Sequence, residues 1–347
     1  MRRGLLIGIA LSLFAASCGG HPAPPPPAPA PARPQLGIDV LWYRHPEDSA
    51  ATIRAKSRRI VSYVAGLHAN AISISFPFYM RGQRASGVHP GTPTPTPRDL
   101  AILVDDATSR GMTVNVRPLL NQDAIGGWRG AISPANPSGW FASYEKFLAP
   151  YLAMAAAHRV TSFSVGAELT SLADAPDWIP LDAWVRTRFH GGLSFSNNWD
   201  AFTVGELGGG PVGQEGVDAY FPLRLGDSAS VGALVTGLNR WLSRPRGIRL
   251  QDIVVQETGI AAQPGSYAHP HTWTDSRDWN FAVQAKWFSA MCTVVRQRHM
   301  AGIYFWDIDF NQNVRRPSPD SDPPLSFIGR VAADAARNCF RYLAAHW

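Results

Sequence analysis

Short apolar runs alternate with longer helical stretches along the whole chain from Leu36 onward. The short runs are rich in β-branched and aromatic residues, as buried strands are, and the stretches between them are long enough to form crossover helices. This alternation predicts a sheet of parallel strands that is covered by helices. The eight expected strands are residues 37–41, 71–76, 113–117, 162–165, 193–196, 217–220, 253–256 and 302–306.

Helices are expected between these strands and after the last one. Thr96-Pro97 and Asp275-Ser276 carry the polar and proline signals with which helices begin. The expected helices are residues 47–67, 97–110, 138–157, 180–188, 228–242, 276–297 and 328–344, with a weak helical signal over 199–214. Eight strands with interleaved helices predict an α/β protein with a single (β/α)8 TIM barrel over residues 35–347. No change in composition separates a second folded domain.

The first 34 residues are expected to lie outside that barrel. Residues 1–18 have a positively charged start, an apolar stretch and small residues before Cys18, which is the organisation of a secretory signal. The segment resembles a bacterial lipobox, with Ala15 where leucine is usual. It therefore favours a lipid on Cys18 over ordinary signal cleavage. Residues 19–34 are rich in Pro and Ala and predict an extended linker. We expect an exported lipoprotein, anchored to a membrane on its periplasmic or cell-surface side.

The charge pattern gives no sign of a nucleic-acid partner. The net charge is +6, but the basic residues are scattered, apart from a cluster at 54–59 that is typical of the solvated face of a helix. The glycines at 208–210 lack the Lys and Ser/Thr that would follow in a phosphate-binding loop, and they predict a flexible connection.

Cysteines and histidines predict neither a metal site nor a bound cofactor. Cys292 and Cys339 lie in expected helices and are either bridged, as an oxidising compartment would allow, or buried as free thiols. His269, His271 and Asp275 follow the seventh strand in one loop. We expect them to lie at the rim of a cleft rather than to bind a metal ion.

Two glutamates end apolar runs: Glu168 follows the fourth expected strand and Glu257 ends the seventh. Either glutamate alone is as well explained by an exposed or salt-bridged strand end. A carboxylate at the C-terminal end of a barrel strand, however, lies where barrel enzymes build their active sites. A pair of carboxyl groups is what glycoside hydrolysis requires, so the two together predict an enzyme that acts on sugars. Glu168 is the better candidate for the acid/base and Glu257 for the nucleophile.

The loops that follow the strands contain many aromatic, amide and acidic side chains. Aromatic rings stack on the C–H faces of sugars, and polar side chains bind the hydroxyl groups. The residues expected to contact a substrate are Trp42, Asn121, Trp128, Arg129, Asn198, Tyr220 and Trp306. Tyr220 is also expected to donate its hydroxyl to Glu257 and so to hold that side chain ionised.

Several segments resemble glycoside hydrolase family 113, which is known for endo-β-1,4-mannanase activity. The similar segments are residues 128–132, 140–147, 163–172, 216–223 and 256–259, and the resemblance covers essentially Gly37 to the C-terminus. It implies a retaining mechanism with Glu168 as acid/base, Glu257 as nucleophile and no metal. It also implies that the substrate is a β-mannan or related neutral β-glycan, bound in an open cleft.

The sequence departs from that family pattern at two positions. Ala167 stands where many relatives have an asparagine that meets the sugar 2-hydroxyl. Arg117-Pro118-Leu119 stands where the family often has Lys-Pro-His, so contacts to the sugar nearest the reaction must differ. Two alternatives follow: a surface glycan-binding lipoprotein without turnover, and a glycosidase on the same barrel that cleaves β-glucans.

Overall fold

The computed structural model describes residues 33–347 except Asp275. The predicted signal, Cys18 and residues 19–32 of the linker lie outside the described residues. Asp275, which was predicted to lie at the rim of the cleft, is also outside the described residues. Among the described residues, no helix combines the length and the hydropathy needed to cross a membrane.

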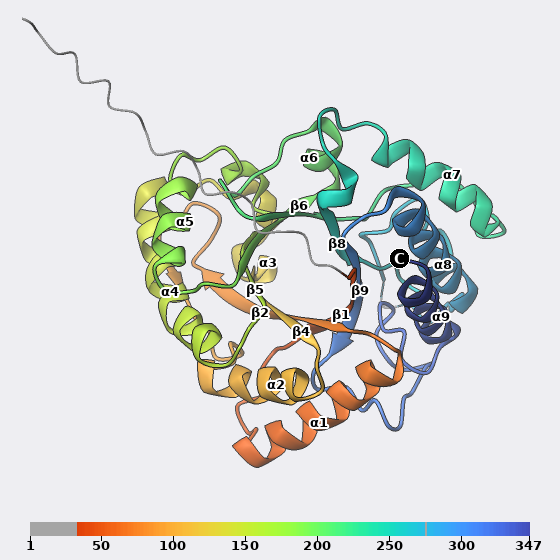
Figure 1. The fold of residues 1–347 in the computed structure, drawn as a ribbon, viewed down its shortest axis with the longest axis horizontal. Helices are drawn as coiled ribbons and strands as arrows, with labels where there is room; N and C mark the ends of the chain where they lie inside the picture. The colour runs from red at the N-terminus through yellow and green to blue at the C-terminus, as the bar shows by residue number, and fades with distance from the viewer. Residues whose placement is uncertain (1–32, 275) are drawn as a thin grey trace, which may run out of the picture.

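Within the described part of the chain, eight parallel strands form a closed ring (Figure 1). The ring closes because β1 pairs with both β2 and β9. In chain order the ring strands are β1 (Gln35–Leu41), β2 (Ala71–Met80), β4 (Thr113–Leu120), β5 (Ser162–Ala167), β6 (Gly192–Asn198), β7 (Gln214–Asp218), β8 (Ile253–Thr258) and β9 (Gly302–Asp309). A short strand, β3 (Val88–His89), pairs antiparallel with β2 outside the ring. The predicted eight-stranded barrel is confirmed.

Helices surround the ring and cover its outer face (Figure 1). The longer ones are α1 (Ala50–Gly66), α2 (Pro97–Ser109), α4 (Pro137–Ala157), α5 (Trp178–Arg186), α7 (Val231–Leu242), α8 (Phe281–Arg298) and α9 (Val331–His346). Two short helices lie in loops, α3 (Gln122–Ile125) after β4 and α6 (Trp199–Val204) after β6. The weak helical signal over 199–214 thus corresponds to a helix of six residues.

Local signals fix where these helices begin. Thr96 caps α2 in a reciprocal capping box with Asp99, and Pro97 occupies the first turn, as predicted. The prediction that a helix begins at Ser276 is wrong, because α8 begins at Phe281 after Asn280. The backbone of Ser276 instead accepts a hydrogen bond from the buried side chain of Gln263, which holds it in the preceding loop.

The two faces of the ring differ in polarity. Residues that face the helices are apolar and build the main core. The interior contains small polar side chains at alternate strand positions, as the period of a strand requires. Asn115 donates to Ser73 at 3.4 Å and to Ser164 at 3.3 Å, and Ser164 is hydrogen-bonded to Ser194 at 2.8 Å. Hydrogen-bonded polar residues therefore connect four strands beneath the mouth of the barrel.

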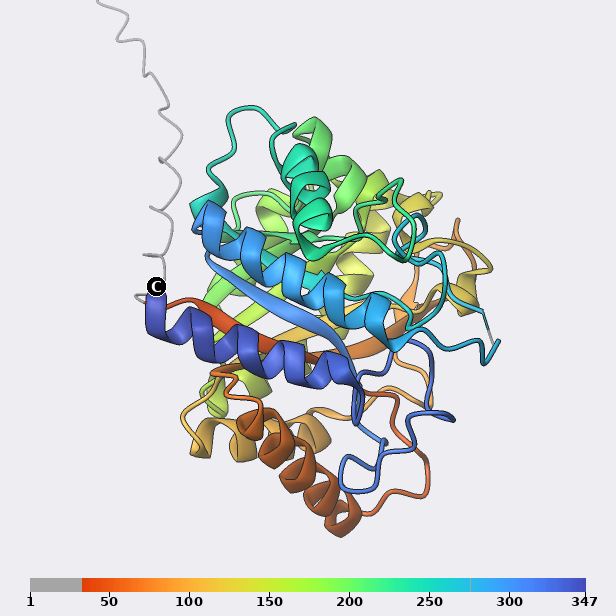
Figure 2. The same ribbon diagram turned by 90° about the vertical axis from the view of Figure 1, so that its right-hand side faces the viewer.

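The last two helices are covalently joined. Cys292 of α8 and Cys339 of α9 form a disulfide, which decides between the two alternatives that the sequence left open. Figure 2 shows α8 and α9 side by side along the barrel wall, with the long loops gathered at the end away from the C-terminus.

Candidate active site

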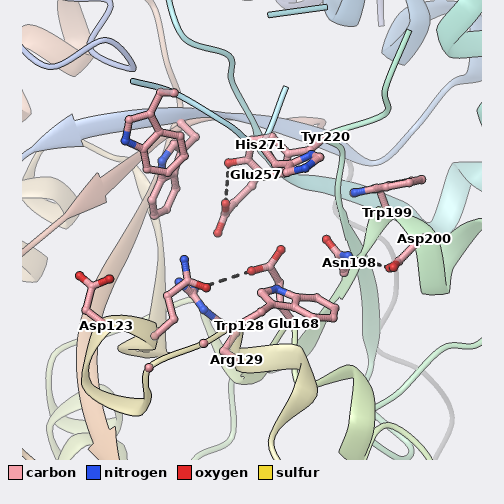
Figure 3. A pocket seen from close by; sticks show the side chains of 15 residues that line it. Asp123, Trp128, Arg129, Glu168, Asn198, Trp199, Asp200, Tyr220, Glu257 and His271 are labelled. Carbon is pink, nitrogen blue, oxygen red and sulfur yellow. Dashed lines mark hydrogen bonds and ion pairs between the residues drawn. The ribbon is translucent and has the colours of Figure 1, made fainter. Parts of the chain in front are cut away.

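A cavity of about 790 Å³ lies where loops follow β4, β5, β6 and β8. Both predicted glutamates line it, and Figure 3 shows their carboxyl groups pointing into the same space. The aromatic residues that line it are Trp128, Trp199, Tyr220, Trp273 and Trp306. A cavity at the C-terminal ends of barrel strands, with aromatic walls and convergent carboxyl groups, has the composition of a ligand site.

Glu257 is held by hydrogen-bond donors on both carboxylate oxygens. It lies near the end of β8 and is 4% exposed. A guanidinium N–H of Arg117 donates to Oε1. The hydroxyl of Tyr220 donates to Oε2 at 2.7 Å (Figure 3). Donors on both oxygens stabilise the carboxylate and fix its direction. The predicted hydrogen bond from Tyr220 is therefore present, although Tyr220 lies two residues beyond the end of β7 rather than within it.

Arg117 connects Glu257 to two further carboxyl groups inside the ring. The fully buried guanidinium donates from Nη2 to Asp218 at 2.9 Å, and Nη1 lies 3.9 Å from the carboxyl group of Asp39. Burial raises the pKa of Asp39 to about 7, against the opposing effect of Arg117. Burial and the neighbouring Glu257 raise the pKa of Asp218 well above its ordinary value. These shifts limit the negative charge that accumulates around one buried cation.

Glu168 has a different environment. It follows β5 with a φ of 55°, a left-handed conformation that is uncommon for non-glycine residues. Its only ion pair within the described residues is with Arg129, whose Nη1 lies 3.8 Å from Oε2. Burial raises the pKa of Glu168 to about 7, with a lowering effect from Arg129 and a raising effect from Glu257. Glu168 therefore keeps its proton up to nearly neutral pH.

The two carboxyl groups thus meet in one cavity in unequal surroundings. Glu257 is oriented by a donor on each carboxyl oxygen, whereas Glu168 is largely desolvated and has a raised pKa. Unequal environments of this kind are how a pair of carboxyl groups divides into a proton donor and a carboxylate. The arrangement can protonate a leaving group and stabilise or attack an electrophilic carbon in the same cavity.

Of the other residues predicted to contact a substrate, Trp128, Arg129, Asn198, Tyr220 and Trp306 line the cavity. Figure 3 labels Trp128, Arg129, Asn198 and Tyr220 around the two glutamates. These side chains come from different strands and loops, and the closed ring brings them together.

Two predicted contact residues do not line the cavity. Trp42 is fully buried and stacks on Phe310 with ring centroids 3.8 Å apart, because its large apolar ring packs in the core. The side chain of Asn121 caps α3 by accepting from the N–H of Ala124 at 2.8 Å, and it donates to the Tyr43 hydroxyl at 3.1 Å. Both residues act in folding the mouth of the barrel rather than as part of the cavity wall.

The cavity also contains acidic and imidazole side chains besides the two glutamates. Sequence reasoning places Asp123 among the loop residues of the cleft and does not assign Asp200 to it. Asp123 and Asp200 line it, and Asn198 donates to Asp200 at 2.6 Å. His271 lines it as expected for a rim residue, and burial lowers its pKa. Among the described residues, no three His, Cys, Asp or Glu side chains are grouped so that they could bind a metal ion.

Arg117, Asp39 and Asp218 were missed entirely as members of the site. The available signal was their position, because each is a charged residue at an inward place in an otherwise buried strand. Buried charges are almost always paired, so three inward-facing charges in strands spaced around one closed ring predict contact across its interior.

The two departures from the family pattern meet at one place. Ala167 and Leu119 are 2% and 5% exposed and form an apolar cluster with Trp306. The wall behind Trp306 is therefore apolar where an amide and an imidazole were expected by resemblance.

Comparison with known proteins identifies the family. A model of glycoside hydrolase family 113 matches residues 51–322. A search of curated proteins found no match.

Similar solved structures show the same fold. A family 113 β-mannanase from Alicyclobacillus acidocaldarius, solved with ManMIm, superposes with a TM-score of 0.73 at 19% identity over 91% of this chain and 100% of that one. A family 113 β-1,4-mannanase in complex form gives 0.70 at 17% identity, over 89% and 99% of the two chains. A GH5_18 protein from Streptomyces cattleya, solved with GlcNAc, gives 0.57 at 13% identity, over 90% and 80%. Because the family model spans most of the sequence, this chain belongs to glycoside hydrolase family 113.

Proposed function

We propose that this protein is a retaining glycoside hydrolase that cleaves a β-1,4-mannan or a related neutral β-glycan. The observation that carries the proposal is the pair of carboxyl groups in one cavity, with Glu257 bound by Arg117 and Tyr220 and Glu168 desolvated beside Arg129. Family membership supports hydrolysis of a glycosidic bond as the reaction.

In the proposed first step, the carboxyl proton of Glu168 passes to the glycosidic oxygen while an oxygen of Glu257 attacks the anomeric carbon. The bond from that carbon to the leaving sugar breaks, and a glycosyl ester on Glu257 forms. In the second step, Glu168 takes a proton from water, the water oxygen attacks the same carbon, and Glu257 leaves as a carboxylate. Two displacements at one carbon retain its configuration.

Arg117 and Tyr220 would orient Glu257 for attack. Each binds one carboxylate oxygen, so the side chain has little freedom to turn away from the anomeric carbon. When the ester forms, the negative charge on Glu257 disappears. Because the Glu257 charge is one cause of the raised pKa values of Asp39 and Asp218, its loss would lower both pKa values and let these carboxyl groups balance the charge of Arg117.

Mannan is the proposed substrate class for two reasons. Two of the solved structures compared above are described as family 113 β-mannanases, and the family model matches this chain over most of its length. Four tryptophans line the cavity, Trp128, Trp199, Trp273 and Trp306, which suits the stacking of uncharged sugar rings.

The direct test is incubation of the purified protein with mannan, glucomannan and cellulose, followed by sizing of the products. We expect mannan and glucomannan to be shortened, and the first-formed product to have the anomeric configuration of the substrate by NMR. Release from cellulose alone would favour the β-glucan alternative, and an inverted first product would contradict the retaining mechanism.

A matched pair of variants separates hydrolysis from simple binding. Glu257→Gln should abolish hydrolysis and keep glycan affinity, whereas Glu206→Gln changes an exposed glutamate outside the cavity and should leave activity unchanged. A wild type that binds these glycans and never shortens them would instead support the glycan-binding lipoprotein.

We further propose that the protein is exported and anchored through a lipid on Cys18. The disulfide between Cys292 and Cys339 supports an oxidising compartment, because such bonds are rare in reducing ones. Metabolic labelling with a radioactive fatty acid should mark the wild type and not Cys18→Ser, with both proteins outside the cytoplasm. Label on Cys18→Ser, or none on the wild type, would overturn the anchor.

A further inference from the structure

A second, smaller hollow adjoins the main cavity and shares one residue with it. This side depression, of about 280 Å³, lies in the loop between β8 and α8. Its wall includes Gln263, Ser266, His269, Thr272, Trp273 and Asp278. Trp273 also lines the main cavity, so this one residue borders both hollows.

The loop that presents Trp273 is held by buried hydrogen bonds. Gln263 is 6% exposed, and its Nε2 donates to the carbonyl oxygens of Thr274 at 2.9 Å and Ser276 at 2.7 Å. Its Oε1 accepts from the N–H of Thr274 at 3.2 Å. Because Thr274 adjoins Trp273 in sequence, Gln263 fixes the backbone beside that ring before any ligand arrives.

A second anchor fixes the base of the same loop. The carboxylate of Asp227, from the segment between β7 and α7, accepts from the N–H of Gly265 at 2.9 Å and from the amide of Asn280 at 3.2 Å. A loop tied at both ends loses little conformational entropy when a ligand binds, which is the condition for a preformed binding surface.

Trp273 is nevertheless 49% exposed, which is unusual for so large an apolar side chain in a loop built this firmly. Beside it, the exposed side chains of His269 and Asp278 offer hydrogen-bonding groups, while the buried hydroxyl of Ser266 already donates to the carbonyl oxygen of Gln263 at 2.9 Å. An exposed aromatic ring flanked by imidazole and carboxyl groups matches the two surfaces of a sugar, the C–H face and the hydroxyl edge.

We infer that the side depression is a distal subsite that binds the substrate chain after it has crossed Trp273 from the main cavity. This inference rests on the proposed function, because the occupant is a continuation of the glycan whose bond is cleaved between Glu168 and Glu257. The shared tryptophan supports this occupant, since a single chain can contact both of its sides. The enzyme should therefore prefer oligosaccharides long enough to reach the depression.

The test measures kcat/KM for manno-oligosaccharides of increasing length. For the wild type, kcat/KM should rise about tenfold once the chain is long enough to stack beyond Trp273. Thr272→Trp fills the depression from an exposed position and should remove that rise. Thr187→Trp, a matched change at an exposed threonine on the far side of the barrel shell, should keep the rise.

Calorimetry of the same oligosaccharides on Glu257→Gln, with and without Thr272→Trp, separates the subsite from the reaction. Affinity should increase with length by about tenfold only when Thr272 is present. If the wild type cleaves no glycan, the proposed function fails while this titration still tests the subsite. An unchanged length dependence in Thr272→Trp, in either measurement, would overturn the inference.

Discussion

The two carboxyl groups of the cavity differ in what surrounds them more than in where they lie. Glu257 receives a donor on each oxygen, from Arg117 and Tyr220, and belongs to a polar network that continues into the ring. Glu168 has one cation at 3.8 Å and a pKa raised to about 7, mainly by burial. Two glutamates thus have surroundings that suit different proposed roles, a carboxylate at Glu257 and a proton donor at Glu168.

This difference comes from the architecture of the barrel. Glu257 lies within the last residues of β8, where Arg117 of β4 reaches it across the ring interior and Tyr220 reaches it from just beyond β7. Glu168 lies one residue beyond β5, where a left-handed backbone directs it into the cavity beside the loop of Arg129. Glu257, at a strand end, and Glu168, just past one, therefore have different local environments.

The largest expected effect follows removal of the oriented carboxylate. Glu257→Ala should lower kcat on mannan by about 10⁴-fold or more, because no group remains to attack the anomeric carbon. Added azide should restore part of the activity on a substrate with a good leaving group and give a product of inverted configuration. A residual rate within about tenfold of the wild type would show that Glu257 is not the nucleophile.

Removal of Glu168, the proposed proton donor, should have a smaller and substrate-dependent effect. Glu168→Ala should lower activity on mannan by about 10³-fold, since general acid catalysis contributes that order of rate. An aryl glycoside whose leaving group needs no protonation should form the glycosyl-enzyme at a much less reduced rate. Equal losses on both substrates would contradict the assignment of Glu168 as the acid.

Much of this contrast was predictable from the sequence. The eight strands were found because buried parallel strands contain short apolar runs, as in Ile253-Val254-Val255, and because the runs recur with helical stretches between them. Glu168 and Glu257 were found because each follows such a run, and the barrel converts that position into a place at the mouth.

Other features needed the three-dimensional structure. Trp42 follows a strand as Trp306 does, but position alone does not say whether a ring turns to the cavity or into the core against Phe310. The disulfide between Cys292 and Cys339 depends on the packing of two helices, which no spacing along the chain determines. Sequence position also gave no partner for Arg117, because its three carboxylate neighbours come from three other strands.

An intermediate effect is expected when Arg117 is replaced by lysine, which keeps the positive charge and lacks the planar guanidinium group. Arg117→Lys should lower kcat about 10²-fold with KM little changed, because an ammonium group cannot bind Glu257 and Asp218 through a planar fork. Thermal unfolding and the binding of an oligosaccharide by calorimetry serve as controls for folding. A variant whose KM rises while kcat is kept would show that Arg117 acts on substrate binding instead.

The smallest expected effect is a shift in pH dependence. Arg129 lowers the pKa of Glu168, so Arg129→Met should raise that pKa above its value of about 7. Because the acid must be protonated, the wild type should lose kcat/KM as pH rises through about 7, and the variant should lose it at higher pH. Arg129→Lys keeps the positive charge and should lose kcat/KM over the same pH range as the wild type. If Arg129→Met lost kcat/KM at a lower pH than the wild type, the ion pair would not be what lowers the pKa of Glu168.

The most direct test of the division between the two carboxyl groups is a ¹³C NMR titration of the protein labelled at glutamate side-chain carboxyl carbons, with Glu168→Gln to assign the resonance. We expect Glu168 to titrate near 7, and to titrate at lower pH in Glu257→Gln, where the neighbouring negative charge is absent. A Glu168 resonance that titrates near its ordinary value of 4.5, unaffected by Glu257→Gln, would contradict the account.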